Sequence, residues 1–267
     1  MINSAYARDV LQWHIAAGVD ETIGDAPVNR FDLVSVPVSP SVSANVPRQS
    51  SPPPTRPAEM PLGPSGEEAV KSAYELAEKA STVDELRQAL EGFDGCALKK
   101  TATNLVFYNG DAKARLMFVG EAPGAQEDRQ GEPFVGPSGE LLNKMLASIG
   151  IERSTVLVSN TVFWRPPGNR TPTPQETAVC MPFMERLIEL VDPDVLVTLG
   201  GPAAKALLGE TQGVGRLRGR WFTYETARMS HPIDATAMFH PAYLLRTPSQ
   251  KRAAWQDLLS IEDKLSG

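Results

Sequence analysis

The segment GEAPGAQEDRQGEPFVGPSG, residues 120–139, gathers several side chains that could do chemistry, directly after a buried apolar run. Its glycines let the backbone turn tightly and approach a ligand, Phe134 offers a flat face, and Glu121 and Glu127 supply carboxylates. It contains neither GxGxxG nor GK[ST], and its carboxylates would repel a pyrophosphate. The segment therefore favours a neutral, planar ligand over a nucleotide phosphate.

Two more polar side chains follow later apolar runs. Asn160 ends one such run and His240 ends another, whereas His14 and His231 have no comparable setting. An amide supplies both a hydrogen-bond donor and an acceptor, and a neutral imidazole supplies one of each. The sequence predicts that Asn160 and His240 join the glycine-rich segment in one site.

The elements that must position these residues form an alternating pattern of buried strands and helices. Continuous apolar strands separated by helices indicate an α/β fold with a parallel sheet covered on both faces, and ligands bind such sheets at the carboxyl ends of the strands. Two shorter helices are expected first, over residues 66–80 and 82–91, the second capped by Ser81 or Thr82. The expected strands are 116–119, 156–158, 195–199 and 235–239, and the later helices are 139–149, 174–190, 202–208 and 249–265.

Composition and length favour one main domain. The chain has 267 residues, of which 42% are hydrophobic, and it contains no apolar run of about 18 residues and no leader sequence. We therefore expect a soluble, cytoplasmic monomer that does not contact a membrane. Cys96 and Cys180 make no disulfide framework and are expected to be reduced thiols.

The net charge of −6 belongs to the N-terminal part, because residues 1–92 hold 13 acidic and 7 basic side chains while residues 93–267 hold 19 of each. The stretch from Arg216 to Arg252 is locally basic and could contact a phosphate backbone, although a solvated surface is the alternative.

The sequence also predicts three parts of the chain. Residues 1–34 contain apolar residues at helical spacing, residues 35–66 are dense in Pro and Ser, and residues 67–267 carry the site. We interpret these as a helical extension, a linker and the catalytic domain. The extension either docks on the domain or recruits a protein partner.

Three segments together resemble family 4 (thermostable-type) uracil-DNA glycosylases. They are GEAPGAQEDRQGEPFVGPSGELL, SNTVFWRPPGNRTP around Asn160, and FHPAYLLR around His240, and the resemblance covers about residues 93–260. It implies a three-layer α/β/α sandwich with a four-stranded parallel sheet. It also implies a repair enzyme that flips uracil out of DNA, hydrolyses the N-glycosidic bond and leaves an abasic site.

The resemblance assigns roles to the residues of the site. It implies that Phe134 stacks on uracil, Asn160 reads the edge of the base, and His240 hydrogen-bonds O2. A carboxylate activates the water, with Glu127 favoured and Glu121 close behind, since Ala122 stands where other branches of the superfamily have Asp. Asp128 is expected to order the loop. The remaining substrate-binding residues are Gly120, Ala122, Pro123 and Gly124.

DNA contacts are expected outside the base pocket. Leu244 or Leu245 could fill the space left by the extruded base, although both could instead be core residues. Arg246, Arg165 and Arg170 would contact the phosphates.

The cysteines depart from the family. Its members carry four cysteines that hold an iron-sulfur cluster, and the corresponding positions here are Phe93, Cys96, Trp164 and Cys180. Neither Phe nor Trp can coordinate iron. We therefore predict that no cluster is bound and that the two aromatic side chains fill its volume.

Two other functions stay open at this stage. The missing cysteines and Ala122 are compatible with a protein of the same fold that binds uracil-containing or abasic DNA with little turnover. A flavodoxin-like domain that binds a small ligand is the third alternative.

Overall fold

The chain divides into two units, residues 1–58 and 59–267. The computed structural model describes residues 66–266. The predicted extension over residues 1–34, and all of the predicted linker over 35–66 except Gly66, lie outside the described residues.

A six-stranded sheet in the order β1-β3-β2-β4-β6-β5 forms the centre of the described part. Its four inner strands are parallel, as predicted. The prediction lacked the two edge strands, which pair antiparallel with their neighbours. The strands are β1 (Tyr108–Gly110), β2 (Leu116–Gly120), β3 (Leu157–Asn160), β4 (Val195–Leu199), β5 (Trp221–Tyr224) and β6 (Ile233–Met238).

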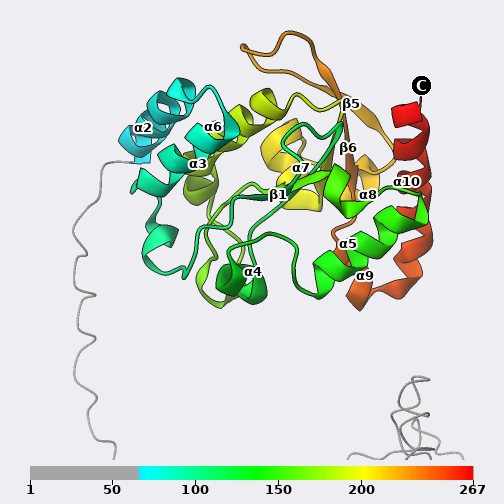
Figure 1. The fold of residues 1–267 in the computed structure, drawn as a ribbon. Helices are drawn as coiled ribbons and strands as arrows, with labels where there is room; N and C mark the ends of the chain where they lie inside the picture. Colours follow the sequence, from blue (N-terminus) through cyan, green and yellow to red (C-terminus); the bar gives the residue numbers. More distant parts are fainter. Residues whose placement is uncertain (1–65, 267) are drawn as a thin grey trace, which may run out of the picture. The chain divides into compact units, whose positions relative to one another are not determined.

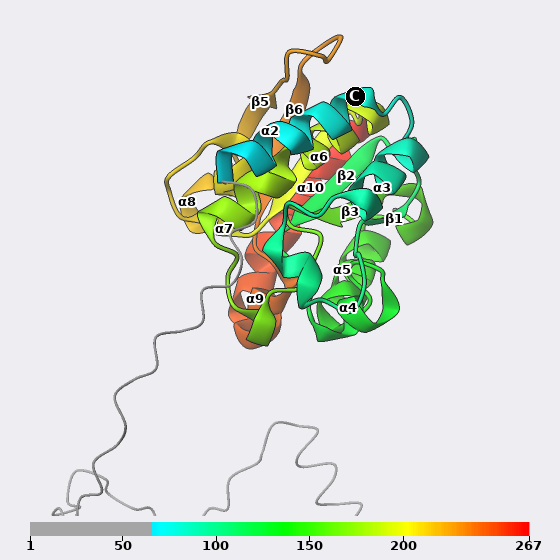
Figure 2. The same ribbon diagram turned by 90° about the vertical axis from the view of Figure 1, so that its left-hand side faces the viewer.

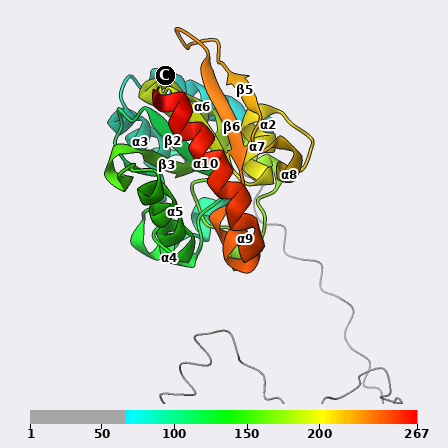
Figure 3. The same cartoon turned by 90° about the vertical axis from the view of Figure 1, so that its right-hand side faces the viewer.

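Helices cover both faces of this sheet. Since successive side chains of a strand point to opposite faces, a strand covered on both faces contributes to two separate buried clusters. In β2, Met117 and Val119 pack in one buried cluster, while Leu116 and Phe118 pack in another. The first cluster lies under α2, α3 and α6, and the second lies under α5, α9 and α10 (Figures 1, 2 and 3). The arrangement is the predicted α/β/α sandwich.

Most of the helices follow the predicted ranges. Thr82 is the cap of α3 and accepts a hydrogen bond from the Glu85 backbone N–H, while Thr173 and Glu176 form a reciprocal capping box at α6. These helices are α2 (Gly66–Lys79), α3 (Val83–Gly92), α5 (Pro137–Ser148), α6 (Pro174–Val191), α7 (Gly201–Leu208) and α10 (Lys251–Ser266).

Several short elements were not predicted, because none is long enough to show an apolar period. They are α4 (Ala125–Gln130), α8 (Val214–Leu217), α9 (Pro241–Arg246), and the 3₁₀ turns η1 (Ala97–Lys100), η2 (Arg153–Thr155), η3 (Pro167–Asn169) and η4 (Pro248–Gln250). Two of them, α4 and α9, carry residues of the predicted site. Across residues 66–266, no helix has both the length and the apolarity required to cross a membrane.

Candidate active site

The parallel strands end in register, and their carboxyl ends form one edge of the sheet, which is distinct from its outer strands β1 and β5. Gly120, the last residue of β2, is the register partner of Asn160, the last residue of β3. On the other side of β2, the Gly200 N–H after β4 donates to the Met238 carbonyl at the end of β6, 2.8 Å away. His240 follows two residues later. Backbone pairing therefore brings the glycine-rich segment, Asn160 and His240 to one edge.

A pocket of about 920 Å³ lies at this edge. The side chains of Glu121, Glu127, Phe134, Asn160 and His240 all line it. The structure therefore brings together residues that the sequence predicted from three separate segments. Ala122, Pro123, Gly124, Arg170 and Arg246 also line the pocket.

Gly120 allows an amide and an aromatic ring to meet above the end of β2. A Cβ atom at this position would lie 2.5 Å from Asn160 Oδ1 and 2.8 Å from Phe134 Cζ. Real Cβ contacts are not this short, so any side chain here would displace one of the two groups. The absence of a side chain at residue 120 is therefore part of the site.

Phe134 is held in an unusual conformation. Its φ of 57° is rare for a bulky residue, and such a conformation persists only where the surroundings enforce it. A Cβ at Gly139 would lie 1.7 Å from the Phe134 carbonyl oxygen, so the first turn of α5 packs directly on this backbone. The Phe134 ring lies 5.8 Å from the His240 ring, at an interplanar angle of 26°.

His240 caps α9 with its own side chain. Its Nδ1 accepts a hydrogen bond from the Ala242 N–H, 3.1 Å away. Burial, together with the Arg246 guanidinium, lowers the pKa of His240 to about 4. The ring is therefore neutral near pH 7 and, because Nδ1 is an acceptor, its proton is on Nε2. The sequence identified the residue but not this tautomer, which depends on the helix that follows it.

The two candidate carboxylates have different surroundings. Glu127 Oε1 accepts a hydrogen bond from the Gly136 N–H, 2.9 Å away, and so ties α4 to the turn before α5. Burial raises the pKa of Glu121, and a hydrogen bond from the Thr171 side chain partly opposes that shift. A raised pKa makes the Glu121 carboxylate a stronger proton acceptor than an ordinary glutamate.

Asp128 does not line the pocket, and its contacts are compatible with the expected loop-ordering role. It is buried, and its carboxylate accepts hydrogen bonds from the backbone N–H groups of Thr103 and Asn104 and from the Thr103 hydroxyl. Arg165 lies 3.9 Å from the same carboxylate.

The segment after β3 forms one wall of the pocket and holds two of the predicted DNA-binding residues. Arg165 donates to Asn169 Oδ1 at 2.7 Å. Arg170 pairs with both oxygens of Glu176, at 2.7 and 2.8 Å. Sequence reasoning assigned no role to many other lining residues, among them Gln250 and three residues of the quoted motif, Pro166, Asn169 and Thr171.

The leucines of α9 have opposite surroundings. Leu244 is 1% exposed and packs in the core, while Leu245 is 43% exposed. Only Leu245 is therefore accessible to DNA. The basic stretch around it is partly engaged in the fold, because Arg218 forms an ion pair with the buried Asp257, and Arg228 lies 3.6 Å from Glu78.

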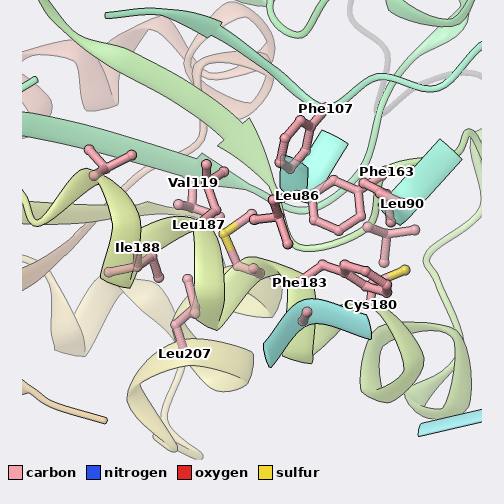
Figure 4. Packing of buried hydrophobic residues seen from close by; sticks show 14 of the residues in the cluster. Leu86, Leu90, Phe107, Val119, Phe163, Cys180, Phe183, Leu187, Ile188 and Leu207 are labelled. Atoms are coloured by element: carbon pink, nitrogen blue, oxygen red, sulfur yellow. The ribbon is translucent and has the colours of Figure 1, made fainter. Parts of the chain in front are cut away.

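The four positions that correspond to cluster ligands lie in one buried cluster. Phe93, Cys96, Trp164 and Cys180 are each at most 3% exposed. Figure 4 shows Cys180 beside Phe183 in the same region, and the Phe93 and Phe183 rings are 5.1 Å apart.

These residues do not fit an iron-sulfur cluster. The two thiols hydrogen-bond, an interaction that lowers the pKa of Cys96 and raises that of Cys180. Two thiols are half of the required set, and aromatic rings stand at the other positions. Over the described range 66–266, no group of three or more His, Cys, Asp or Glu side chains is placed to hold a metal ion.

Comparison with known proteins agrees with this geometry. The family model described as "Uracil DNA glycosylase superfamily" matches residues 107–259, a range that includes Glu121, Asn160 and His240.

The chain belongs to the uracil-DNA glycosylase superfamily.

Within the superfamily, the chain is similar to type-4 uracil-DNA glycosylases. It is 39% identical to that of Archaeoglobus fulgidus over 184 residues, which are 67% of this chain and 92% of the relative. It is 41% identical to that of Thermotoga maritima over 157 residues, 58% and 79% of the two chains. It is 34% identical to that of Pyrobaculum aerophilum over 180 residues, 66% and 91% of the two chains.

Proposed function

We propose that the protein is a uracil-DNA glycosylase that hydrolyses the N-glycosidic bond of uracil in DNA, releasing free uracil and leaving an abasic site. The observation that carries this proposal is the meeting of Phe134, Asn160 and a neutral His240 around one pocket. These are a flat apolar face, an amide and a hydrogen-bond donor without charge. Such a set matches the face, the edge and the O2 atom of a pyrimidine that has left the base stack.

The amide of Asn160 selects uracil. Its N–H can donate to O4, and its carbonyl can accept from N3–H, whereas cytosine presents an amino group and an unprotonated N3 at these positions. A site built to hydrogen-bond a substrate group strongly rejects an analogue that lacks it, because buried polar atoms are then left unpaired. The pairing of Gly120 with Asn160 supports this role, since it holds the amide at the edge of the sheet.

His240 stabilises the departing base. As the glycosidic bond breaks, both bonding electrons move to the base and negative charge develops on O2. A hydrogen bond from Nε2 of the neutral ring stabilises that charge.

We assign water activation to Glu121 and loop positioning to Glu127. The sequence favoured Glu127, but one of its oxygens already accepts from Gly136, while the pKa of Glu121 is raised by burial. Glu121 accepts a proton from the water that attacks C1′, and the uracil anion leaves and is protonated by solvent. The carboxylate also stabilises positive charge on the sugar before the attack.

We further propose that DNA contacts surround the pocket. Leu245, exposed on α9, would occupy the space left by the flipped base, and Arg246 would lie against the phosphates. Arg165 and Arg170 would contact the DNA strand from the opposite wall of the pocket.

We also infer that the catalytic domain spans residues 67–267 and works as a cytoplasmic monomer. We infer that it holds no iron-sulfur cluster, because aromatic rings replace two of the ligands.

The alternative is a protein of this fold that binds uracil-containing or abasic DNA without turnover. The two are separated by incubating the protein with a single-stranded oligonucleotide that contains one uracil, followed by alkali. We expect strand cleavage at the uracil for the wild type and none for the His240→Ala variant. A gel shift without cleavage in the wild type would show that the binder interpretation is right.

A further inference from the structure

Helices α5, α9 and α10 cover the same face of the sheet (Figure 3). Residues of all three line a second depression. It has a volume of about 210 Å³. Its floor is apolar and comes from all three helices: Leu141 and Met145, Leu244, and Ala254, Trp255 and Leu258. We call this depression the α5–α10 groove.

Large apolar side chains are exposed on the helices that form this groove. Only four large hydrophobic residues are exposed among the described residues, and three of them, Leu245, Trp255 and Leu259, belong to α9 and α10. Trp255, which is 40% exposed, lines the groove itself. Because Leu245 is assigned to DNA, Trp255 and Leu259 are the exposed large apolar residues of α9 and α10 that remain, and such exposure marks a surface that another molecule covers.

The charged residues of the groove have a single sign. Lys144 on α5 and Lys251 on α10 line it, and no acidic residue does. Neither lysine takes part in an ion pair within residues 66–266. An occupant that fits this surface therefore combines an apolar group for the floor with negative charge for the two ammonium groups.

The groove is separate from the catalytic pocket but shares two walls with it. On α9, Leu244 lines the groove, whereas Ala242, Tyr243 and Arg246 line the pocket. On α5, Ser138 lines the pocket and Leu141 lines the groove. A molecule bound in the groove would thus lie beside the active site without closing it.

We propose that the α5–α10 groove binds a short acidic segment of a partner protein, which inserts an apolar side chain against Trp255 and pairs its carboxylates with Lys144 and Lys251. Nucleic acid also carries negative charge, but the floor is mainly aliphatic. It offers one aromatic ring for stacking and no hydrogen-bond donor for a phosphate besides the lysines and Ser148. A peptide with leucine or aromatic anchors matches an aliphatic groove between helices.

The probe for this proposal is a phage-displayed library of random short peptides, panned on the full-length protein. The library is first depleted on the double variant Lys144→Glu, Lys251→Glu, which removes peptides that bind elsewhere. We expect the enriched peptides to contain Asp or Glu next to Leu, Phe or Trp. Resynthesised with a fluorescent label, they should bind the Trp255→Ala variant about tenfold more weakly than the wild type.

The matched control is Lys71→Glu, which removes an exposed lysine from α2, on the opposite face. It should bind the same peptides as the wild type does. Equal melting temperatures of all variants establish that they are folded, independently of any enzyme activity.

Two outcomes would overturn the proposal. One is the absence of enriched peptides, or enriched peptides that bind Trp255→Ala as well as the wild type. The other is a loss of affinity for uracil-free single-stranded DNA in the double variant that greatly exceeds the loss in Lys71→Glu, since that would assign the groove to nucleic acid.

Discussion

At the scale of single residues, the pocket depends on groups that are small as much as on groups that react. Gly120 leaves room for Asn160 Oδ1 and Phe134 Cζ, and Gly139 leaves room for the Phe134 carbonyl. A motif shows that these glycines are present, but the structure gives the distances that explain them.

The Gly120→Ala substitution tests this requirement. The new Cβ would lie 2.5 Å from Asn160 Oδ1, so the amide must move. A displacement of about 1 Å in a catalytic site can cost roughly 100-fold in rate, and we expect a loss of that size in uracil release. The control is Gly92→Ala in α3, where a Cβ meets no atom within 4 Å. Equal activity of the two variants would refute the steric role of Gly120.

The Glu121→Gln and Glu127→Gln variants separate the two carboxylates. Loss of a general base costs about 100-fold or more, which we expect for Glu121→Gln in single-turnover uracil release. Glu127→Gln keeps an acceptor for the Gly136 N–H but weakens that charge-assisted hydrogen bond, so the rate should fall less, by about tenfold.

The same two variants differ in their dependence on pH. The base must be ionised, and burial raises the pKa of Glu121 above the 4.5 of an ordinary glutamate. The wild-type rate should therefore fall as the pH drops through this raised pKa. The fall should persist in Glu127→Gln and disappear in Glu121→Gln. The reverse pattern would return the role of base to Glu127.

At the scale of elements, the sequence predicted what depends on local pattern. The four parallel strands contain the buried apolar runs seen in the sequence, and α3 and α6 begin with side-chain caps. The edge strand β1 has three residues and β5 has two partly exposed aromatic side chains, so neither shows a buried run. The helix α4, with sequence AQEDRQ, has one buried side chain and no apolar period.

The same difference between local sequence pattern and contacts of distant segments decides which site residues could be predicted. Residues at the ends of recognisable strands, such as Asn160, could be assigned from the sequence. Thr171 and Gln250 line the pocket only because their loops fold back on it. That folding depends on contacts between distant segments, such as the approach of Arg165 to Asp128 at 3.9 Å.

The cap of α6 connects helix stability to the pocket wall. Thr173 accepts from the Glu176 N–H, and Glu176 in turn holds Arg170. Loss of such a cap costs about 1 kcal/mol, so Thr173→Ala should lower the melting temperature by a few degrees. It should also raise KM for a uracil-containing oligonucleotide. Thr82→Ala removes the cap of α3 instead, and should lower the melting temperature alone. A KM that rises equally in both variants would contradict the connection.

At the scale of the whole molecule, we propose that part of the hydrophobic core occupies the volume of a metal site. Phe93 and Trp164 are buried at two positions that the resemblance assigns to cluster ligands, and truncating a buried aromatic residue to alanine costs about 3–5 kcal/mol. We therefore expect Trp164→Ala to unfold at a much lower denaturant concentration than the wild type.

Iron content provides the second measurement. The purified wild type should contain no stoichiometric iron and show no broad absorbance in the blue part of the visible spectrum. Addition of a chelator should leave its melting temperature unchanged. Bound iron in the wild type, or a large loss of stability with chelator, would show that the aromatic side chains do not replace the cluster.

The pairing of Gly120 with Asn160 has a consequence for folding errors. Strand side chains alternate between faces, so a slip of β3 by one position along β2 would send the amide to the wrong side of the sheet. Such a misaligned chain could keep its secondary structure while losing the ability to discriminate bases. Loss of base discrimination would then reveal a shifted strand that circular dichroism does not detect.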